Sequence, residues 1–262
     1  MTRLYLVFYQ LALALFGMGY LVLRILKGKG LTGLAQRLGF YRPALRRNLK
    51  AQARPIWLHV VSVGEALAAQ GLVEALRRQD PGIPWVVTTV TPTGQEVARR
   101  LVRSKKDLLL YLPWDFDWIV RRALRLIRPR LFLAFETELW PVLFHRLSRR
   151  RVPIVVANGR VSPAAYRRYL WGRFLVSRTL APVSLILAQS PQDARRFAAL
   201  GAAKDRLVIA GNVKWDRQAP AGTDGEGPKV RNLLGSCRRS FYGSPAPPIR
   251  GRSPCCWPST GI

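Results

Sequence analysis

The alternation of two kinds of segment after residue 55 is the strongest constraint on the fold of this chain. Short apolar runs rich in β-branched residues alternate with longer stretches in which apolar side chains recur at helix-type spacing. This is the pattern of βα units, in which a helix crosses over between parallel strands. The predicted strands are Ile56–Val61, Trp85–Val90, Leu108–Leu112, Leu131–Phe135, Ile154–Ala157, Leu185–Ala188 and Leu207–Ala210.

Amphipathic segments separate these strands and carry arginines on their outward faces. The predicted helices are Ala66–Arg78, Gly94–Ser104, Trp118–Ile127, Leu139–Arg149, Tyr166–Leu180 and Gln192–Leu200. Seven strands joined in this way predict an α/β domain of Rossmann-like type over residues 56–217. Many of the arginines are therefore expected on solvated helix faces.

The N-terminal region contains a stretch without any charged residue, from Leu4 to Leu23. Roughly 20 apolar residues are enough for a helix to cross a hydrocarbon core. We therefore predict a membrane anchor helix over residues 1–27, followed by a basic juxtamembrane segment over residues 28–55. Lysines and arginines are concentrated after the apolar stretch, so the positive-inside rule predicts that the body of the protein faces the cytoplasm.

Two other interpretations of this stretch stay open. A cleaved signal peptide would have a shorter apolar region ending in a small-residue cleavage site, which Arg24–Lys27 does not resemble. A helix that lies in the membrane interface without spanning it is equally compatible with the sequence, because four side chains moderate the hydrophobicity. They are Tyr5, Tyr9, Gln10 and Tyr20.

The charge balance is strongly basic, with 43 Lys and Arg residues against 14 Asp and Glu and a formal net charge of +29. Self-repulsion at this charge favours an anionic partner, and the candidate classes are nucleic acid, an anionic membrane surface and a phosphorylated substrate. Cys237, Cys255 and Cys256 lack the spacing of a zinc site or a disulfide framework. We therefore predict no metal or redox chemistry.

The composition changes after about Asp216. Residues 227–262 contain no acidic residue, and Pro, Gly, Ser, Arg and Cys crowd together without helical or strand periodicity. Residues 218–262 are therefore predicted to be a disordered tail or the product of a shifted reading frame. The run Cys255-Cys256-Trp257 favours the shifted frame, because these residue types favour burial.

Loops that follow the strands are the first places to look for function, because ligands of open α/β sheets gather at the carboxyl ends of strands. Ser62-Val63-Gly64-Glu65 follows the first predicted strand, which puts the Glu65 carboxylate at this edge. The alternative is a first-turn glutamate stabilised only by the helix dipole. Glu136 and Glu138 follow the fourth strand close to Glu65, and Glu138 is expected to cap the helix that comes next.

Other polar or cationic residues follow the second, fifth and seventh strands at the same edge. They are Thr91, Thr93, Gly94, Asn158, Arg160, Asn212 and Lys214. The threonines and the glycine can offer hydroxyls and backbone amides to a phosphate or sugar, but they are equally good helix caps. His59 and His145 are expected to be packed or at the surface rather than catalytic.

A series of short motifs occurs along the chain. They are WLH at 57–59 with SVGE at 62–65, TVTPTG at 89–94, YLPWD at 111–115, ETELWP at 136–141, NGRVS at 158–162, AQS at 188–190 and GNVKWD at 211–216. In this order they resemble the motifs of 3-deoxy-D-manno-octulosonic acid (Kdo) transferases. The resemblance runs from the N-terminal helix to about Asp216 and corresponds to the N-terminal half of that family.

The resemblance implies a GT-B glycosyltransferase, with two Rossmann-like domains facing a cleft, that transfers Kdo from CMP-Kdo to a lipid A precursor at the cytoplasmic face of the bacterial inner membrane. It implies that the N-terminal domain takes the acceptor and that Glu65 is the general base. It assigns transition-state stabilisation to Glu136 and Lys214. It also implies inversion in a single displacement, with no metal and no cofactor besides the donor substrate. The residues expected to bind substrate are Ser62, Gly64, Thr91, Thr93, Gly94, Glu138, Asn158, Arg160 and Asn212.

The chain departs from the family after Asp216, where the second domain, which supplies most contacts to CMP, is expected to begin but only a short remainder follows. We therefore expect little or no transferase activity from this chain alone. The basic charge fits a phosphorylated lipid among anionic lipids, and nothing in the sequence resembles an RNA-binding aromatic platform or a recognition helix. The alternatives are a non-catalytic, membrane-tethered domain that binds lipid A or anionic lipid, and a basic nucleic-acid-associated protein.

Overall fold

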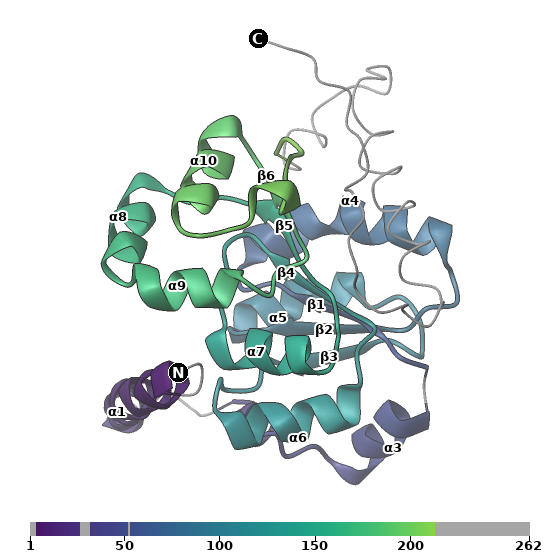
Figure 1. Cartoon of the computed structure of the whole chain (residues 1–262). Coiled ribbons are helices and arrows are strands. Elements are labelled where there is room, and N and C mark those ends of the chain that lie inside the picture. The colour runs from purple at the N-terminus through teal and green to yellow at the C-terminus, as the bar shows by residue number, and fades with distance from the viewer. Residues whose placement is uncertain (1–3, 27–31, 52, 213–262) are drawn as a thin grey trace, which may run out of the picture. The chain divides into compact units, whose positions relative to one another are not determined.

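The strands form one parallel sheet. The computed structural model describes residues 4–26, 32–51 and 53–212. Within them, seven strands are hydrogen-bonded in the order β3-β2-β1-β4-β5-β6-β7, and every neighbouring pair is parallel (Figure 1). The strands are β1 (Ile56–His59), β2 (Trp85–Thr89), β3 (Leu108–Tyr111), β4 (Leu131–Phe135), β5 (Ile154–Gly159), β6 (Leu185–Ala188) and β7 (Leu207–Ile209). The predicted α/β class and the predicted strands are confirmed, and the strand order is of the Rossmann type.

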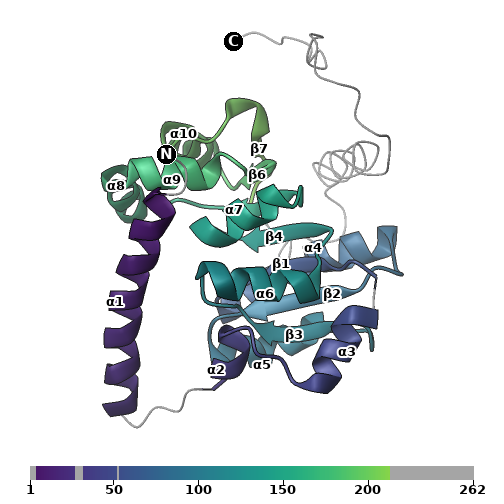
Figure 2. The same cartoon turned by 60° about the horizontal axis from the view of Figure 1, so that its bottom comes forward.

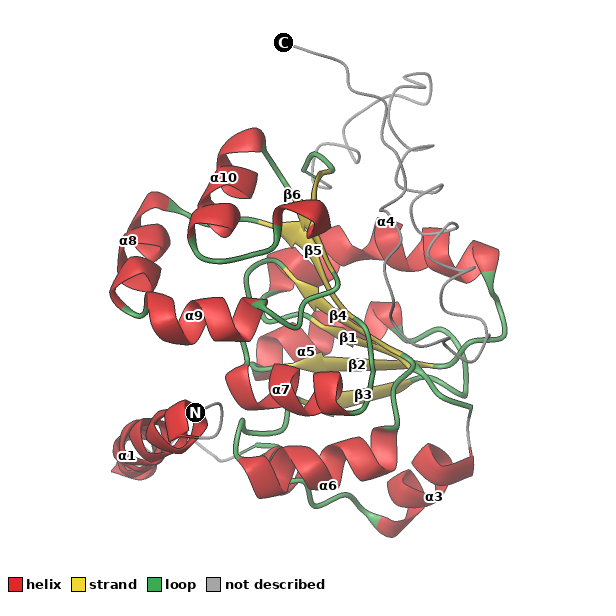
Figure 3. Cartoon of the chain, in the orientation of Figure 1, coloured by secondary structure: helices red, strands yellow, loops and turns green. Residues whose placement is uncertain are grey.

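Helices cover both faces of this sheet (Figures 1 and 3). The side chains of α4 and α5 pack into the hydrophobic cluster on one face, whereas those of α6, α7 and α9 belong to the cluster on the other. The helices are α1 (Leu4–Leu26), α2 (Leu34–Arg37), α3 (Pro43–Ala51), α4 (Val63–Gln79), α5 (Pro92–Ala98), α6 (Asp117–Ile127), α7 (Pro141–Arg149), α8 (Pro163–Trp171), α9 (Arg173–Leu180) and α10 (Pro191–Ala199), with short 3-10 helices η1 (Arg99–Leu101) and η2 (Lys204–Arg206).

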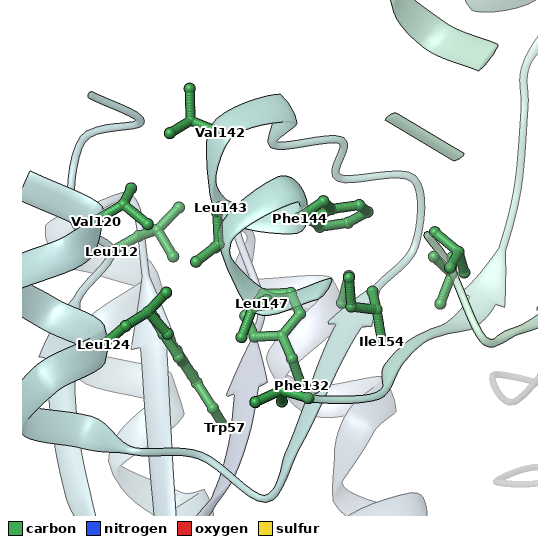
Figure 4. Packing of buried hydrophobic residues seen from close by; sticks show 14 of the residues in the cluster. Trp57, Leu112, Val120, Leu124, Phe132, Val142, Leu143, Phe144, Leu147 and Ile154 are labelled. Atoms are coloured by element: carbon green, nitrogen blue, oxygen red, sulfur yellow. The ribbon is translucent and has the colours of Figure 1, made fainter. Parts of the chain in front are cut away.

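An aromatic stack fixes α7 to the middle of the sheet. Successive residues of β1 point to opposite faces, so that Trp57 and Leu58 belong to different hydrophobic clusters. Trp57 packs edge-on against Phe132 of β4 with ring centroids 5.2 Å apart, and Phe132 contacts Phe144 of α7 in the same way at 5.9 Å (Figure 4). Burial of each such ring contributes about 1.5–3 kcal/mol, so the stack holds α7 and the loop before it in place.

Residues 166–180, predicted as a single helix, form two. α8 ends at Trp171 and α9 begins at Arg173, with Gly172 between them at φ −96° and ψ 24°. Glycine is about 1 kcal/mol less favourable than alanine inside a helix, so a break costs least at this position. The prediction was wrong because helix-type spacing of apolar residues continues across the glycine.

Helix α1 is docked on the domain along one side. Tyr5 and Leu6 are buried in the hydrophobic cluster that also contains α6 and α7. The side-chain oxygen of Gln10 accepts a hydrogen bond of 2.7 Å from the backbone N–H of Asp117, and the Tyr9 hydroxyl donates to Asp115. Among the described residues, no helix is both long and apolar enough to cross a membrane. The predicted membrane-spanning anchor is therefore not confirmed.

Two predictions fall on residues that lie outside the described ranges. The first is the assignment of residues 218–262 to a disordered or frameshifted tail, and the second is the position of Lys214 at the edge of the sheet.

Asp115 provides a test of how α7 is held. Its carboxylate accepts hydrogen bonds from the backbone N–H groups of Val142 (2.9 Å) and Leu143 (2.7 Å). We expect Asp115→Ala to lower the free energy of unfolding by about 2–4 kcal/mol in urea denaturation, because it leaves two buried N–H groups unpaired. Asp117→Ala is the control and should cost at most about 1 kcal/mol, because its ion pairs with Arg121 and Arg146 are partly exposed. Equal losses in the two variants would contradict this account of α7.

Candidate active site

Glu65 lies in the first turn of α4, directly after β1. The Ser62 hydroxyl caps the helix by accepting a hydrogen bond of 3.2 Å from the backbone N–H of Glu65. In return, the Glu65 carboxylate accepts hydrogen bonds from the N–H of Val61 (2.8 Å) and from the Ser62 hydroxyl (2.9 Å). These reciprocal bonds form a capping box. Glu65 therefore stabilises the first turn of α4, which was the alternative to a functional role.

The surroundings of Glu65 distinguish it from an ordinary cap. The residue is only 7% exposed. Burial raises the pKa of its carboxyl group; the hydrogen bonds from Val61 and Ser62 oppose this increase, and the negative charge of Glu136 adds to it. A buried carboxylate with a raised pKa is a better proton acceptor than an exposed one.

Glu136 occupies a strained backbone position at the end of β4. Its φ of 59° lies in the left-handed region, which costs a non-glycine residue roughly 1–2 kcal/mol. Its backbone N–H donates a hydrogen bond of 2.8 Å to the carbonyl oxygen of Ala157 in the neighbouring strand β5. The sheet therefore holds the conformation that directs the chain away from β4 at this residue.

Glu138 does not cap α7, so that prediction was wrong. The N-cap residue of α7 is Trp140, which makes no side-chain cap, and the first N–H groups of the helix bond to Asp115 instead. Burial, together with the negative charges of Glu65 and Glu136, raises the pKa of Glu138 to about 7. The structure thus brings Glu65, Glu136 and Glu138 close enough together to interact at the carboxyl edge of the sheet.

The end of β5 and the residues after it are tied to the loop that carries the glutamates. The Thr137 hydroxyl accepts a hydrogen bond of 3.2 Å from the backbone N–H of Arg160 and donates one to the carbonyl oxygen of the same residue. Asn158 is buried and has a left-handed φ of 55°, and its carbonyl oxygen accepts a hydrogen bond of 3.1 Å from the side chain of Gln189. Arg160 is exposed beside this loop.

The segment after β2 has the capping role that was the alternative to substrate binding. The Thr91 hydroxyl accepts a hydrogen bond of 3.0 Å from the backbone N–H of Gly94 and lies 3.5 Å from the carbonyl oxygen of Val61. The Thr93 hydroxyl is exposed and lies 3.4 Å from that of Thr91. The start of α5 therefore packs against the turn that holds Glu65.

Two residues that shape this site were not assigned a role from the sequence. Asp115 is the most informative, because α7 begins with Pro141 and lacks a Ser, Thr, Asp or Asn at its own N-cap position, which signals a cap from elsewhere in the chain. Tyr169 of α8 is a second example: burial raises its pKa, and the charge of Glu138 contributes to the increase. Asn212, in contrast, was predicted to bind substrate, and it is the last described residue of the chain.

Two further observations concern groups without an assigned role in catalysis. His59 is fully buried, its Nδ1 lies 3.1 Å from the carbonyl oxygen of Thr88, and burial lowers its pKa to about 4. It is a packed histidine, as expected.

Within the part of the chain that the structure describes, no three His, Cys, Asp or Glu side chains are arranged to hold a metal ion.

Gly94 allows a test of the close contact between α5 and the turn after β1. A Cβ atom at Gly94 would lie 2.8 Å from both the Thr91 hydroxyl and the Val61 carbonyl oxygen, whereas nothing lies within 4 Å at Gly71 in α4. We expect Gly94→Ala to destabilise the protein by about 1–3 kcal/mol, and Gly71→Ala to stabilise it by up to about 1 kcal/mol. Thermal unfolding of both variants checks this, and a stabilising Gly94→Ala would refute the contact.

The interaction among the carboxylates can be measured directly. We expect the Glu138 carboxyl to titrate near pH 7 in NMR spectra of protein labelled with 13C-glutamate. Glu65→Gln should lower that pKa, because it removes a neighbouring negative charge that opposes ionisation. Asp193→Asn is the control and should leave the titration unchanged, because Asp193 is not among the charges that raise the Glu138 pKa. A Glu138 pKa that is insensitive to Glu65→Gln would show that the two groups do not interact.

The chain is similar to known proteins over most of the described domain. Residues 32–217 match the family model described as 3-deoxy-D-manno-octulosonic-acid transferase (kdotransferase). A protein named 3-deoxy-D-manno-octulosonic acid transferase from Haemophilus influenzae is 37% identical over 185 residues, which cover 70% of this chain and 42% of the relative. A protein of the same name from Bordetella pertussis is 33% identical over 172 residues, which cover 64% and 39%.

The chain thus spans less than half the length of these relatives. Among solved structures, the S. aureus MnaA–UDP complex is similar with a TM-score of 0.46 and 14% identity, over 69% of this chain and 52% of that one.

Proposed function

Because the chain belongs to the Kdo transferase family, we propose that residues 56–212 form the acceptor-binding domain of a GT-B glycosyltransferase. The proposed reaction is transfer of Kdo from CMP-Kdo to a lipid A precursor in lipopolysaccharide biosynthesis. The observation that carries this proposal is the group of three interacting carboxylates, Glu65, Glu136 and Glu138, at the carboxyl edge of the sheet. Like charges are costly to gather in a partly buried site, and such sites are commonly functional.

Glu65 is proposed as the general base. It would accept the proton of the acceptor sugar hydroxyl as that oxygen attacks the anomeric carbon of Kdo, and the CMP phosphate would leave from the opposite side in a single displacement with inversion. Two observations support this role: burial raises its pKa, and the adjacent Gly64 is exposed with no side chain to obstruct approach. Each carboxylate oxygen has a second lone pair beyond the one used in the capping box.

Glu136 and Lys214 are proposed to stabilise the transition state. Positive charge develops at the anomeric carbon of a sugar during displacement, and the carboxylate of Glu136 would interact favourably with it. Lys214 would offset the negative charge on the departing CMP phosphate. Glu138, with a pKa of about 7, is proposed to bind an acceptor hydroxyl in either protonation state.

The remaining proposed contacts are to substrate and membrane. Ser62, Gly64, Thr91, Thr93, Gly94, Asn158, Arg160 and Asn212 are proposed to bind substrate, of which Gly94 and Thr91 would act mainly by fixing the turn beside Glu65. We propose that the protein works at the cytoplasmic face of the bacterial inner membrane, against an anionic surface, without a metal, a cofactor or nucleic acid.

The function is tested with two proteins. One is the purified chain, which we expect to bind the lipid A precursor. The other is a hybrid in which residues 32–212 replace the matching part of the Haemophilus influenzae relative, which we expect to transfer Kdo, detected as the mass increase of the precursor. A hybrid that folds and binds precursor without transferring Kdo would favour a non-catalytic binder, and absence of binding by both proteins would refute the proposal.

The role of Glu65 gives a sharper prediction. We expect Glu65→Gln in the hybrid to lower kcat by about 10²–10⁴-fold with a much smaller change in KM, because the proton acceptor is lost while the shape of the side chain is kept. Steady-state kinetics with CMP-Kdo and the lipid A precursor measure both constants.

Asp193→Asn is the matched control for this variant. Asp193 forms the same kind of box at the start of α10, accepting hydrogen bonds from the Val161 N–H (2.9 Å) and the Ser190 hydroxyl (2.5 Å). It should lower stability but leave kcat within about threefold, because its carboxylate is not among the charges that raise the pKa of Glu65 or Glu138. Equal losses of kcat in the two variants would show that Glu65 acts only as a helix cap and not as the general base.

A further inference from the structure

His59 and Trp140 join the two parts of the chain that carry the glutamates. His59 is the last residue of β1, the strand that leads to Glu65. Trp140 follows Glu138 in the loop between β4 and α7. The imidazole and indole rings meet edge to face, with ring centroids 5.9 Å apart and an interplanar angle of 73°. Because β1 and β4 are neighbours in the middle of the sheet (Figure 2), this contact holds the loop against the end of β1.

The hydrogen bonds around His59 determine which ring nitrogen carries the proton. The Nδ1 atom lies 3.1 Å from the carbonyl oxygen of Thr88 and 3.2 Å from the Thr88 hydroxyl oxygen. The carbonyl oxygen can only accept a hydrogen bond, and the hydroxyl donates its own hydrogen to the carbonyl oxygen of Leu58, 3.3 Å away. Nδ1 is therefore the donor. Because burial lowers the His59 pKa to about 4, the ring is neutral at pH 7 and Nε2 keeps an unprotonated lone pair.

Each of the two rings has one buried nitrogen without a hydrogen-bond partner. Among the residues that the structure describes, neither His59 Nε2 nor Trp140 Nε1 is paired. The first is an acceptor and the second is a donor, so the two atoms are complementary. Most buried polar groups in proteins are paired, either with protein or with ordered water. A small group that both accepts and donates a hydrogen bond would satisfy this pair.

A second tryptophan shows what is particular to the pair. The Trp85 indole N–H is also buried and unpaired within the described ranges. The side chain over its ring is that of Arg77, whose unpaired Nε is another donor. The two atoms are therefore not complementary. Trp85 begins β2 and so lies at the amino edge of the sheet, away from the glutamates.

We propose that one buried water molecule joins His59 to Trp140, accepting a hydrogen bond from Trp140 Nε1 and donating one to His59 Nε2, and that this water link holds Glu138 near Glu65. Rings with centroids 5.9 Å apart are close enough for their nitrogens to share one water through hydrogen bonds of about 2.9 Å each. Buried waters of this kind bridge polar groups that otherwise lack partners and are costly to remove.

The water link connects both sides of the carboxylate group. On one side, β1 continues from His59 to Val61, whose N–H donates a hydrogen bond to the Glu65 carboxylate. On the other side, Trp140 and Glu138 belong to the same short loop. His59 and Trp140 are thus positioning residues, which act on the reaction through the two glutamates. The inference rests on the proposed function for its purpose, but the water link itself is tested without turnover.

The first experiment detects the water link in the purified full chain by NMR. Spectra of protein labelled with 15N-histidine should show His59 in the Nδ1–H form at pH 7, and His145→Gln assigns the signals of the two histidines. The Trp140 indole N–H should show cross-relaxation with a long-lived water molecule, and this signal should be lost in His59→Leu. A proton on Nε2, a direct N–H···N hydrogen bond, or the absence of the water signal in the wild type would each overturn the proposal.

The second experiment measures whether the water link positions Glu138. Trp140→Phe keeps an aromatic ring but removes the N–H donor. The Glu138 carboxyl should then move away from Glu65, and its pKa should fall toward the usual value of about 4.3. Trp85→Phe is the matched control, because it also removes a buried indole N–H, and it should leave the Glu138 titration unchanged. Equal changes in the two variants, or no change in Trp140→Phe, would overturn the proposal.

The third experiment measures kinetics in the hybrid with the Haemophilus influenzae relative. Trp140→Phe should lower kcat by about tenfold or more with KM within about threefold, whereas Trp85→Phe should leave both within about threefold. His59→Gln, which places an acceptor near the position of Nε2, should retain more of kcat than His59→Leu. Equal losses in these two variants would overturn the positioning role. A water link that is present in a hybrid unable to transfer Kdo would count against the proposed function and not against the link.

Discussion

The buried carboxylate of Asp115 is the interaction on which the arrangement of the active edge depends. It accepts hydrogen bonds from the first N–H groups of α7 and from the Tyr9 hydroxyl, and so joins the loop after β3 to both α7 and α1. Burial raises its pKa to about 6, which shows that keeping a charge there is costly. Each buried N–H group left without an acceptor would cost about 1–3 kcal/mol. The carboxylate therefore fixes the start of α7, and with it the loop that carries the two glutamates.

Local patterns sufficed to predict the strands, because buried parallel strands read as continuous apolar runs. The edge at which the polar residues gather followed from the parallel sheet itself. What could not be predicted depends on contacts between distant residues. The cap of α7 is Asp115, which accepts a hydrogen bond from the N–H of Val142, 27 positions later in the sequence. Because this contact is distant in sequence, Glu138 was wrongly predicted to be the cap. The break at Gly172 was missed for a different reason. The spacing of apolar residues does not indicate where a helix ends if the same spacing continues into the next helix.

Two capping boxes in this fold show why local geometry does not identify a catalytic group. Ser62 with Glu65 and Ser190 with Asp193 make equivalent hydrogen bonds at the starts of α4 and α10. Only the first box lies beside other carboxylates, in a site where one glutamate also holds a left-handed backbone. Both features cost stability. Glu65 thus differs from an ordinary helix cap because other negatively charged side chains lie close to it, and a helix cap does not require them.

The same reasoning applies to the arginines. Most basic side chains on a helical surface are simply solvated, and their number alone does not define a partner. Around α8 and α9 the signal is stronger, because exposed aromatic rings and arginines occur together while acidic residues are absent from residue 139 to residue 192. Apolar exposure without charge would favour self-association, and charge without apolar exposure would favour any polyanion. Their combination distinguishes this part of the surface from helix faces that carry only solvated arginines.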